Sequence, residues 1–291
     1  MTDDPFVAHR SLLFTVAYEM LGSAADAEDV VQETWLRWAE LGTGQHEVRD
    51  PRAYLVRIVT RQALNRLRTQ ARRREEYVGP WLPEPLVTSP DVAEDVELAE
   101  SVSIAMLTVL ETLGPIERAV FVLREVFETP YEEIAAAVGK TPATVRQIAH
   151  RAREHVAARR PRVQVSVSEQ TAVVERFLSA VRSGDINGLM EVLAPDVVVV
   201  ADGGGVVRAA PRPIVGAKPV AAFLGGLAKL VGDFDLTLTW LNGGPAMRVD
   251  IDAEIDTVAS LVVEDGRIAR IYAIRNPHKL SRLDERADLS R

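Results

Sequence analysis

The sequence predicts a multidomain protein in which two all-α domains are followed by a C-terminal α+β domain. Apolar residues recur at helical spacing through roughly the first 160 residues, which is typical of amphipathic helices. A proline-rich acidic stretch interrupts this pattern, and closely spaced prolines disfavour regular structure. The last part of the chain has helical patterns followed by four strand-like runs, an order typical of an α+β fold. We therefore divide the chain into residues 5–76, 77–95, 96–162 and 163–291.

Composition limits the possible functions. At 291 residues the chain can hold several hydrophobic cores, and its net charge of −8 provides no overall basic field for nucleic acid. Cysteine is absent, which excludes disulfides, thiol catalysis and cysteine-type zinc sites and fits a reducing cytoplasm. The histidines lack the spacing of metal ligands, and no apolar run is long enough to span a membrane. We expect a cytoplasmic protein with no metal, cofactor or membrane partner.

Residues 5–76 are predicted to form three helices, over about 6–21, 24–40 and 50–74. The second helix carries a polar stripe of Asp29, Gln32 and Glu33. Such a stripe is most often only a solvated face. Trp35 and Trp38 lie three positions apart on the same helix, and we expect both in the core.

Arginines recur along the third helix at roughly every fourth position, at Arg57, Arg61, Arg68 and Arg72, with Asn65 between them. An arginine row of this length suits a phosphate backbone, and such binding weakens as salt rises. A solvated helix end whose cations offset the helix dipole explains the same pattern equally well.

The stretch 77–95 has prolines on both sides of Trp81 and Leu82. No Lys or Arg occurs between Glu75 and Glu117, so the stretch is an acidic, extended linker. A large apolar pair does not fit a solvated linker. We therefore expect Trp81 and Leu82 to dock against another part of the chain.

Residues 96–162 are predicted to begin with a helix over 96–113 and a second helix from Gly114 to Phe127. The stretch Thr129–Arg160 then reads as two short helices separated by a glycine turn at Gly139.

Thr129 and Thr141 are each followed by proline, as N-caps often are, and Glu132 is placed to complete a capping box with Thr129. The exposed face of the second short helix carries four hydrogen-bonding side chains, Arg146, Gln147, His150 and Arg151. This pattern predicts a helix-turn-helix that reads a major groove. A helical hairpin with a solvated basic face is the alternative.

The last domain, residues 163–291, is predicted to wrap a curved antiparallel sheet around helices. One strand runs into the glycine loop Gly203–Gly205 and ends at Asp202. We expect Asp202 to lie in the loop rather than to be buried. Few aromatic residues would line a cavity in this domain, so we do not expect catalysis.

Several motifs carry a resemblance to a known family. DAEDVVQETWLRW (26–38), DPRAYLVRIVTRQALNRLR (50–68), and LGPIERAVFVLREVF with Thr129–Arg160 resemble regions two and four of bacterial extracytoplasmic-function sigma factors. YVGPWLPEP (77–85), DGGG (202–205) and NPHKL (276–280) resemble the sigma-J-like subgroup, which carries a fused C-terminal SnoaL-like domain.

The resemblance implies that core RNA polymerase and promoter DNA are the partners. It places residues 5–76 as region two, 96–162 as region four and 163–291 as a SnoaL-like, NTF2-like cone-shaped α+β barrel. The polymerase would be bound by Asp29, Gln32 and Glu33. The minus-ten element would be bound by Arg61, Asn65 and Arg68, and the minus-thirty-five element by Arg146, Gln147, His150 and Arg151.

In the resembling subgroup the SnoaL-like domain regulates the sigma core in cis. By this resemblance the interdomain regulatory residues are Trp81, Leu82, Pro83, Asp202, Gly203, Gly204, Gly205, Asn276, Pro277, Lys279 and Leu280. This chain has Val206 and His278 where the family more often has lysine and aspartate. The barrel fold also encloses a pocket, which leaves room for a small ligand.

Two other functions remain open at this stage. One is a ligand-responsive helix-turn-helix transcription factor whose barrel binds a small molecule. The other is a bifunctional enzyme resembling cyclases and ketosteroid isomerase, with Asp202 as its base. The polar stripe of residues 24–40 argues for a sigma factor, because a repressor has no use for a polymerase-binding surface.

Overall fold

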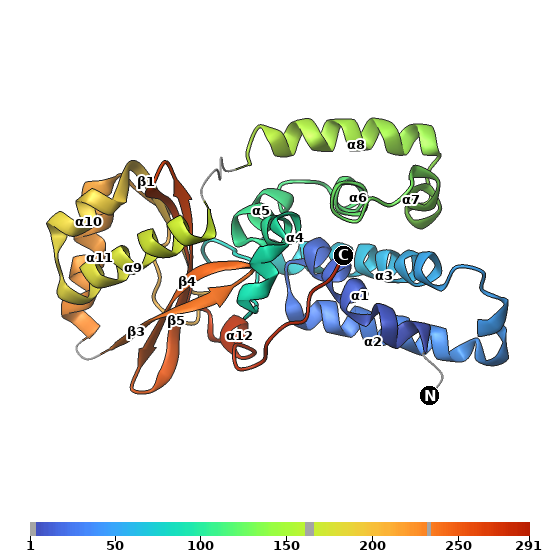
Figure 1. Cartoon of the computed structure of the whole chain (residues 1–291), viewed down its shortest axis with the longest axis horizontal. Helices are drawn as coiled ribbons and strands as arrows, with labels where there is room; N and C mark the ends of the chain where they lie inside the picture. The colour runs from blue at the N-terminus through green and yellow to red at the C-terminus, as the bar shows by residue number, and fades with distance from the viewer. Residues whose placement is uncertain (1–3, 161–165, 232–233) are drawn as a thin grey trace.

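The computed structural model describes residues 4–160, 166–231 and 234–291, with the side chains of 71–73 and 227–231 left aside. Figure 1 shows helices α1 to α8 on one side of the molecule and the sheet domain on the other. The C-terminus returns to the helical side, where the Ser290 amide donates to the Thr15 hydroxyl at 3.1 Å. The predicted fold class, two helical domains followed by an α+β domain, is confirmed. Within the described residues, no helix combines the length and apolar content needed to span a bilayer.

The first helical domain contains three α-helices and one 3-10 helix: α1 (Pro5–Leu21), α2 (Ala24–Glu40), η1 (Gly42–Glu47) and α3 (Pro51–Glu75). Each α-helix begins at a side-chain cap, because Asp4, Ser23 and Asp50 each accept a hydrogen bond from a first-turn amide. Trp38 is fully buried as expected, but Trp35 is 46% exposed, so its predicted core position is wrong.

The second helical domain begins after the 3-10 helix η2 (Pro90–Glu94). The helix predicted over 96–113 is two helices, α4 (Val96–Val102) and α5 (Ile104–Leu110). The break occurs because the Ser103 backbone is extended and its hydroxyl caps α5 by accepting from the Met106 amide. The chain continues through α6 (Pro115–Phe121) and the π-helix η3 (Val122–Val126).

The helix-turn-helix consists of α7 (Tyr131–Val138) and α8 (Pro142–Ala157). Gly139 takes the left-handed conformation between them, at φ +67°, and Thr141 caps α8 through the Thr144 amide. The predicted capping box of Thr129 and Glu132 is wrong. Pro130 has an extended ψ of 143°, so α7 starts one residue later and has no side-chain cap.

The C-terminal domain packs three helices against one curved sheet. The helices are α9 (Val167–Ser183), α10 (Ile186–Val192) and α11 (Ala217–Val231). The strands are β1 (Leu193–Asp202), β2 (Ile214–Val215), β3 (Asp235–Leu241), β4 (Gly244–Ile251), β5 (Glu254–Glu264) and β6 (Arg267–Ile274), followed by the short helix α12 (Pro277–Leu280).

In the described residues the sheet order is β2-β1-β6-β5-β4-β3, with β1 and β6 parallel and the other neighbouring pairs antiparallel. Register shifts interrupt the β1–β6, β4–β5 and β5–β6 pairs, and such irregularities bend a sheet around its helices.

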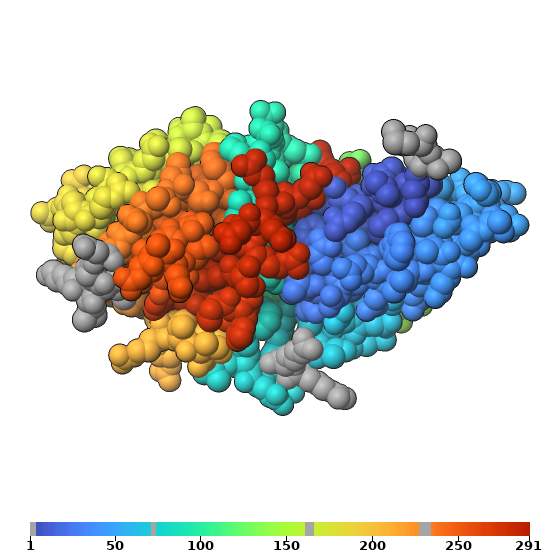
Figure 2. Space-filling view, turned by 90° about the horizontal axis from the view of Figure 1, so that it is seen from below, coloured from blue at the N-terminus to red at the C-terminus, as the bar shows by residue number. Residues whose placement is uncertain are grey.

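The domains share hydrophobic cores instead of touching only at their surfaces. One core joins both helical domains, from Phe6 in α1 to Val156 in α8, and includes Leu289 from the C-terminal segment. Another joins Leu82 of the linker and Ile104 of α5 to residues of the sheet domain. Figure 2 shows the C-terminal segment crossing the boundary between the sheet domain and the first helices.

Candidate functional site

A buried ion pair joins the glycine loop, the C-terminal motif and the linker. Asp202 is the last residue of β1 and is fully buried, so the expectation of a loop carboxylate is wrong. Its Oδ2 lies 2.8 Å from Lys279 Nζ and accepts from the Leu82 amide at 2.9 Å. Its Oδ1 accepts from the Tyr77 hydroxyl. The pair is buried because the strand end, α12 and the linker all close over it.

Two aromatic rings of the linker enclose the ammonium of Lys279. Its Nζ lies 3.5 Å from the Trp81 ring centroid and 5.0 Å from that of Tyr77, and it donates to the Leu82 carbonyl. Burial lowers the pKa of Lys279, while the Asp202 carboxylate beside it works in the opposite direction. We call Tyr77, Trp81, Asp202 and Lys279 the lysine cluster.

The glycine loop packs against the lysine cluster without room for side chains. A Cβ on Gly204, at φ +62°, would lie 2.2 Å from the Asn276 amide nitrogen. That nitrogen donates to the Tyr77 hydroxyl at 2.9 Å. Among the predicted interdomain residues, Leu82, Pro83 and Leu280 are also buried, whereas Pro277 is exposed. The two residues that depart from the family pattern, Val206 and His278, are exposed and stay outside the cluster.

A second interdomain contact was not predicted from the sequence. Asn242, in the turn between β3 and β4, is 2% exposed and reaches three segments. Its Nδ2 donates to the Tyr18 hydroxyl at 2.7 Å and to the Val102 carbonyl at 2.8 Å, and its Oδ1 accepts from the Leu86 amide at 2.9 Å. Asn242 therefore ties α1, α4 and the linker to the sheet domain. From the sequence, Asn242 is recognisable only as a turn residue, and its contacts with other domains are not.

Charged groups also join the two helical domains to each other. Arg74 of α3 forms an ion pair with Glu111, which follows α5, and Arg118 of α6 approaches the same carboxylate at 3.3 Å. Arg118 also donates to the Met20 carbonyl at 2.8 Å, and burial lowers its pKa to about 10. These contacts tie the end of α1 and the end of α3 to the second helical domain.

Glu19 of α1 is a buried carboxyl facing α4. Its Oε1 accepts from the Ser101 hydroxyl at 2.7 Å, and its Oε2 has no hydrogen-bond partner within the described part of the chain. Burial raises the pKa of Glu19 from 4.5 to about 8.

We expect the α1–α4 contact to weaken with rising pH. Between pH 4.5 and about 8 the folded protein holds the Glu19 proton that the unfolded chain has lost, so stability falls through this window and levels off above it. Glu19→Gln should remove this dependence, with Glu40→Gln, an exposed carboxyl on α2, as the control. Urea unfolding measured from pH 5 to 9 tests it. An unchanged slope in Glu19→Gln would contradict the assignment.

The candidate minus-ten residues lie on α3, and one of them contacts the helix-turn-helix. Arg61 donates from Nη2 to the Ala136 carbonyl at 2.8 Å and from Nε to the Ala137 carbonyl at 3.3 Å, both in α7. Asn65 and Arg68 are exposed and bond to each other. The Arg72 side chain lies outside the described residues.

The candidate polymerase-binding residues Asp29, Gln32 and Glu33 are all exposed on α2. Arg66 of α3 approaches Asp29 at 3.1 Å and Glu33 at 3.6 Å, which holds part of the stripe in place. Trp35 and Leu36 are also exposed, at 46% and 53%, on the same helix. Exposed large apolar residues beside charged ones are typical of a protein-binding surface, and sequence periodicity had placed Trp35 in the core instead.

The candidate minus-thirty-five residues Arg146, Gln147, His150 and Arg151 are all exposed on α8, opposite its buried face. Arg146 approaches Glu132 at 3.1 Å and lies over the Tyr131 ring, and His150 approaches Glu154 at 3.7 Å. Exposed pairs of this kind are weak, so these side chains can leave them to contact another molecule. Among the described residues, no group of three or more His, Asp or Glu could hold a metal ion.

Two helical units, the second ending in a helix-turn-helix, define a promoter-recognition factor of the sigma-70 class. The family descriptions Sigma-70 region 2 and Sigma-70, region 4 match residues 6–73 and 103–156. The chain is 37% identical to the ECF RNA polymerase sigma factor SigJ of Mycobacterium tuberculosis, over 95% of this chain and 92% of the relative. It is 34% identical to the probable ECF sigma factor SigI of the same species, over 97% of this chain and 95% of the relative.

The crystal structure of Mycobacterium tuberculosis SigJ superposes with a TM-score of 0.77 at 33% identity, covering 96% of this chain and 98% of that one. The chain therefore belongs to the extracytoplasmic-function RNA polymerase sigma factors. The predicted resemblance to sigma factors with a fused SnoaL-like domain is confirmed. The alternative, a ligand-responsive helix-turn-helix transcription factor whose barrel binds a small molecule, is not favoured, because the relatives are sigma factors.

Proposed function

We propose that this sigma factor works in the cytoplasm, where it directs core RNA polymerase to a set of promoters, and that its SnoaL-like domain holds it in a closed, inactive form. In this proposal residues 5–76 and 96–162 are the DNA- and polymerase-binding units, 77–95 is the linker, and 163–291 is the regulatory domain. The lysine cluster and Asn242 are the contacts by which that domain acts.

The main support for a closed form, in which the two helical domains are in contact, is the contact between Arg61 and α7. A residue proposed for the minus-ten element is bonded to the helix-turn-helix proposed for the minus-thirty-five element. The two elements lie about 25 base pairs apart by their names, which is roughly 85 Å of B-DNA at 3.4 Å per base pair. Helices in direct contact cannot reach both elements, so promoter binding requires α3 and α7 to separate.

The linker supports the same conclusion. Leu82 and Glu84 are 1% and 6% exposed, and the Glu84 carboxylate accepts from Ser23 at 2.9 Å and from the Ala24 amide at 2.8 Å. The linker therefore closes the N-terminus of α2 in this form. The linker is held by α2 and by Asp202 of the sheet domain, so its release requires the sheet domain to move away from the first helical domain.

The proposed contacts follow from side-chain chemistry. Arg146 can form a bidentate pair with a guanine edge, and Gln147 with an adenine edge. Arg61, Asn65 and Arg68 would meet the minus-ten element once Arg61 leaves α7. Asp29, Gln32 and Glu33, with Trp35 and Leu36, would form the polymerase-binding surface.

In this proposal the C-terminal domain acts by binding and not by catalysis. The buried carboxylate considered as a base, Asp202, is paired with Lys279 and does not line the domain's cavity.

The test measures promoter-specific transcription and the domain separation in the same full-length protein. The chain lacks cysteine, so Val7→Cys on α1 and Glu154→Cys on α8 would be the sole labelling sites for a fluorophore pair. We expect high transfer efficiency in the free protein and a large drop when core polymerase and promoter DNA are added. Transcription without any change in transfer efficiency would show that the closed form is the working form.

A further inference from the structure

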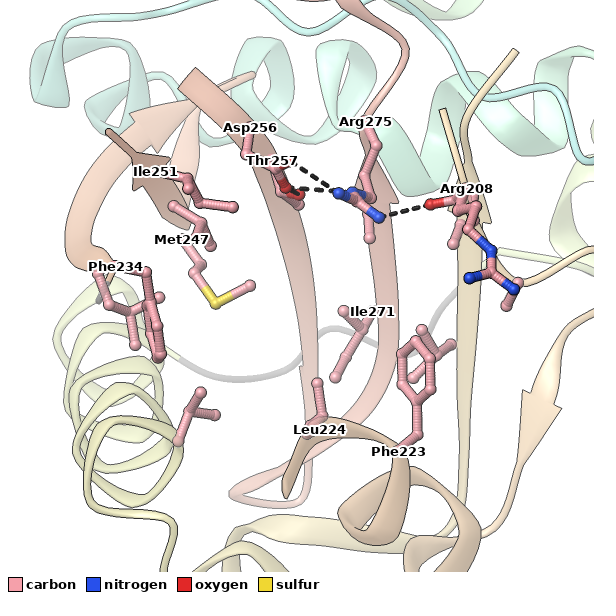
Figure 3. A pocket seen from close by; sticks show the side chains of 18 residues that line it. Arg208, Phe223, Leu224, Phe234, Met247, Ile251, Asp256, Thr257, Ile271 and Arg275 are labelled. Atoms are coloured by element: carbon pink, nitrogen blue, oxygen red, sulfur yellow. Dashed lines mark hydrogen bonds and ion pairs between the residues drawn. The ribbon is translucent and has the colours of Figure 1, made fainter. Parts of the chain in front are cut away.

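The C-terminal domain contains a cavity of about 540 Å³ between its curved sheet and α11. Its lower part in Figure 3 is apolar, with side chains from α11, from β4 and β6, and from the residue before β3, which include Phe223, Leu224, Phe234, Met247 and Ile271. A cavity of this size and lining is typical of a small-molecule site. At roughly 30 Å³ per heavy atom, it holds on the order of 10–20 such atoms.

The opposite end of the cavity is polar and contains two arginines. Arg275 forms a bidentate pair with Asp256, at 2.7 and 3.1 Å, and donates to the Arg208 carbonyl. The Arg208 side chain is exposed, and its guanidinium has no hydrogen-bond or ion-pair partner in the described part of the chain. Figure 3 shows Arg275, Asp256 and Thr257 together at this end, with the Arg208 carbonyl facing Arg275 and the Arg208 guanidinium at the edge of the cavity. One carboxylate and two guanidinium groups leave one positive charge uncompensated.

We propose that this cavity binds an amphipathic carboxylate, with its apolar body between the sheet and α11 and its carboxylate at Arg208 and Arg275. Arginine recognises a carboxylate through two parallel hydrogen bonds, which a neutral head group cannot match. A lone unpaired arginine at the mouth of an apolar cavity favours such a ligand over a fully apolar one. The inference rests on the proposed regulatory role of this domain and gives that role a ligand.

The position of Arg275 connects the cavity to the lysine cluster. The backbone amides of Arg275 and Asn276 donate to the Asp202 carbonyl at 2.8 and 3.0 Å. The Arg275 side chain faces the cavity, whereas the next residue, Asn276, binds Tyr77. A carboxylate that competes with Asp256 for Arg275 therefore acts one residue from the interdomain contact. Ligand binding and domain separation must then influence each other reciprocally if the two forms differ in affinity.

The test compares decanoate with decanol, which have the same chain length and differ in head group. Binding to the full-length protein is measured by isothermal titration calorimetry. We expect decanoate to bind at least tenfold more tightly than decanol. Arg208→Gln should lower decanoate affinity about tenfold, which corresponds to about 1.4 kcal/mol, and leave decanol unchanged. Arg208 is exposed, so this change leaves the fold intact.

The matched control is Arg212→Gln, an exposed arginine in the same loop that does not line the cavity. Equal affinity for the two ligands, no binding of either, or an equal loss in both arginine variants would each overturn the proposal. A failure here is distinguishable from a failure of the proposed function, because transcription and domain separation are measured without added ligand.

Discussion

Lys279→Met is expected to open the molecule and to cause the largest loss of closed-form stability of any single side-chain change in the lysine cluster. Methionine has a similar length, so the cavity around it stays filled, but Asp202 keeps its buried charge with no cation beside it. Removing one partner of a buried pair costs about 3–5 kcal/mol. Transfer efficiency between labelled α1 and α8 should fall in the free protein, without polymerase.

Two further variants separate this effect from a general loss of charge. Arg282→Met removes a half-buried cation that approaches Glu285 at 3.6 Å and lies near enough to Glu84 to lower its pKa, and weak pairs of this kind contribute about 0–1 kcal/mol. Adding Asp202→Asn to Lys279→Met should restore much of the closed form, because the buried charge is then gone. If Lys279→Met behaves like Arg282→Met, the lysine cluster does not hold the domains together.

Separation of the domains in Lys279→Met should also change the transcription activity. If the closed form is the inactive one, Lys279→Met should initiate transcription at lower polymerase concentrations than the unchanged chain. Opening with no gain in transcription would mean that the SnoaL-like domain acts on a later step.

Local sequence patterns predicted the elements that depend on local physics. The Thr141 cap, the Gly139 turn and the buried face of α8 followed from capping and apolar spacing, and all are present. The predictions of helix bounds and burial failed where tertiary contacts determine the structure. Ser103 interrupts a continuous apolar stripe, and Trp35 shares its spacing with Trp38 but faces solvent. Neither outcome is visible in the periodicity of one helix.

The interdomain site was predicted only in part, because it too depends on contacts between segments that are distant in the sequence. Motifs pointed to Trp81, Asp202 and Lys279, but the burial of Asp202 requires three distant segments to meet. The contact of Arg61 with α7 depends on how two domains pack. Asn242 looked like an ordinary turn residue, since Asn-Gly is a common turn signal whatever the turn touches.

Asn242→Ala is expected to weaken the closed form by about 3–5 kcal/mol. Three hydrogen bonds would be lost at roughly 1 kcal/mol each, and the Tyr18 hydroxyl and the Leu86 amide would stay buried without this partner. Asn242 also has a φ of +52°, which costs alanine about 1–2 kcal/mol more than glycine. The midpoint of domain separation in urea, followed by the same fluorophore pair, measures the loss.

Two comparisons assign this loss to its causes. Asn242→Gly removes the hydrogen bonds but accepts the left-handed backbone, so it should lose less than Asn242→Ala by about the backbone cost. Asp265→Ala changes a residue of similar φ, +49°, in the exposed β5–β6 turn, and should leave domain separation unchanged. If Asn242→Gly matches the unchanged chain, the side chain of Asn242 contributes nothing to closure. The regulatory domain would then hold the helical domains through the lysine cluster and the shared apolar core alone.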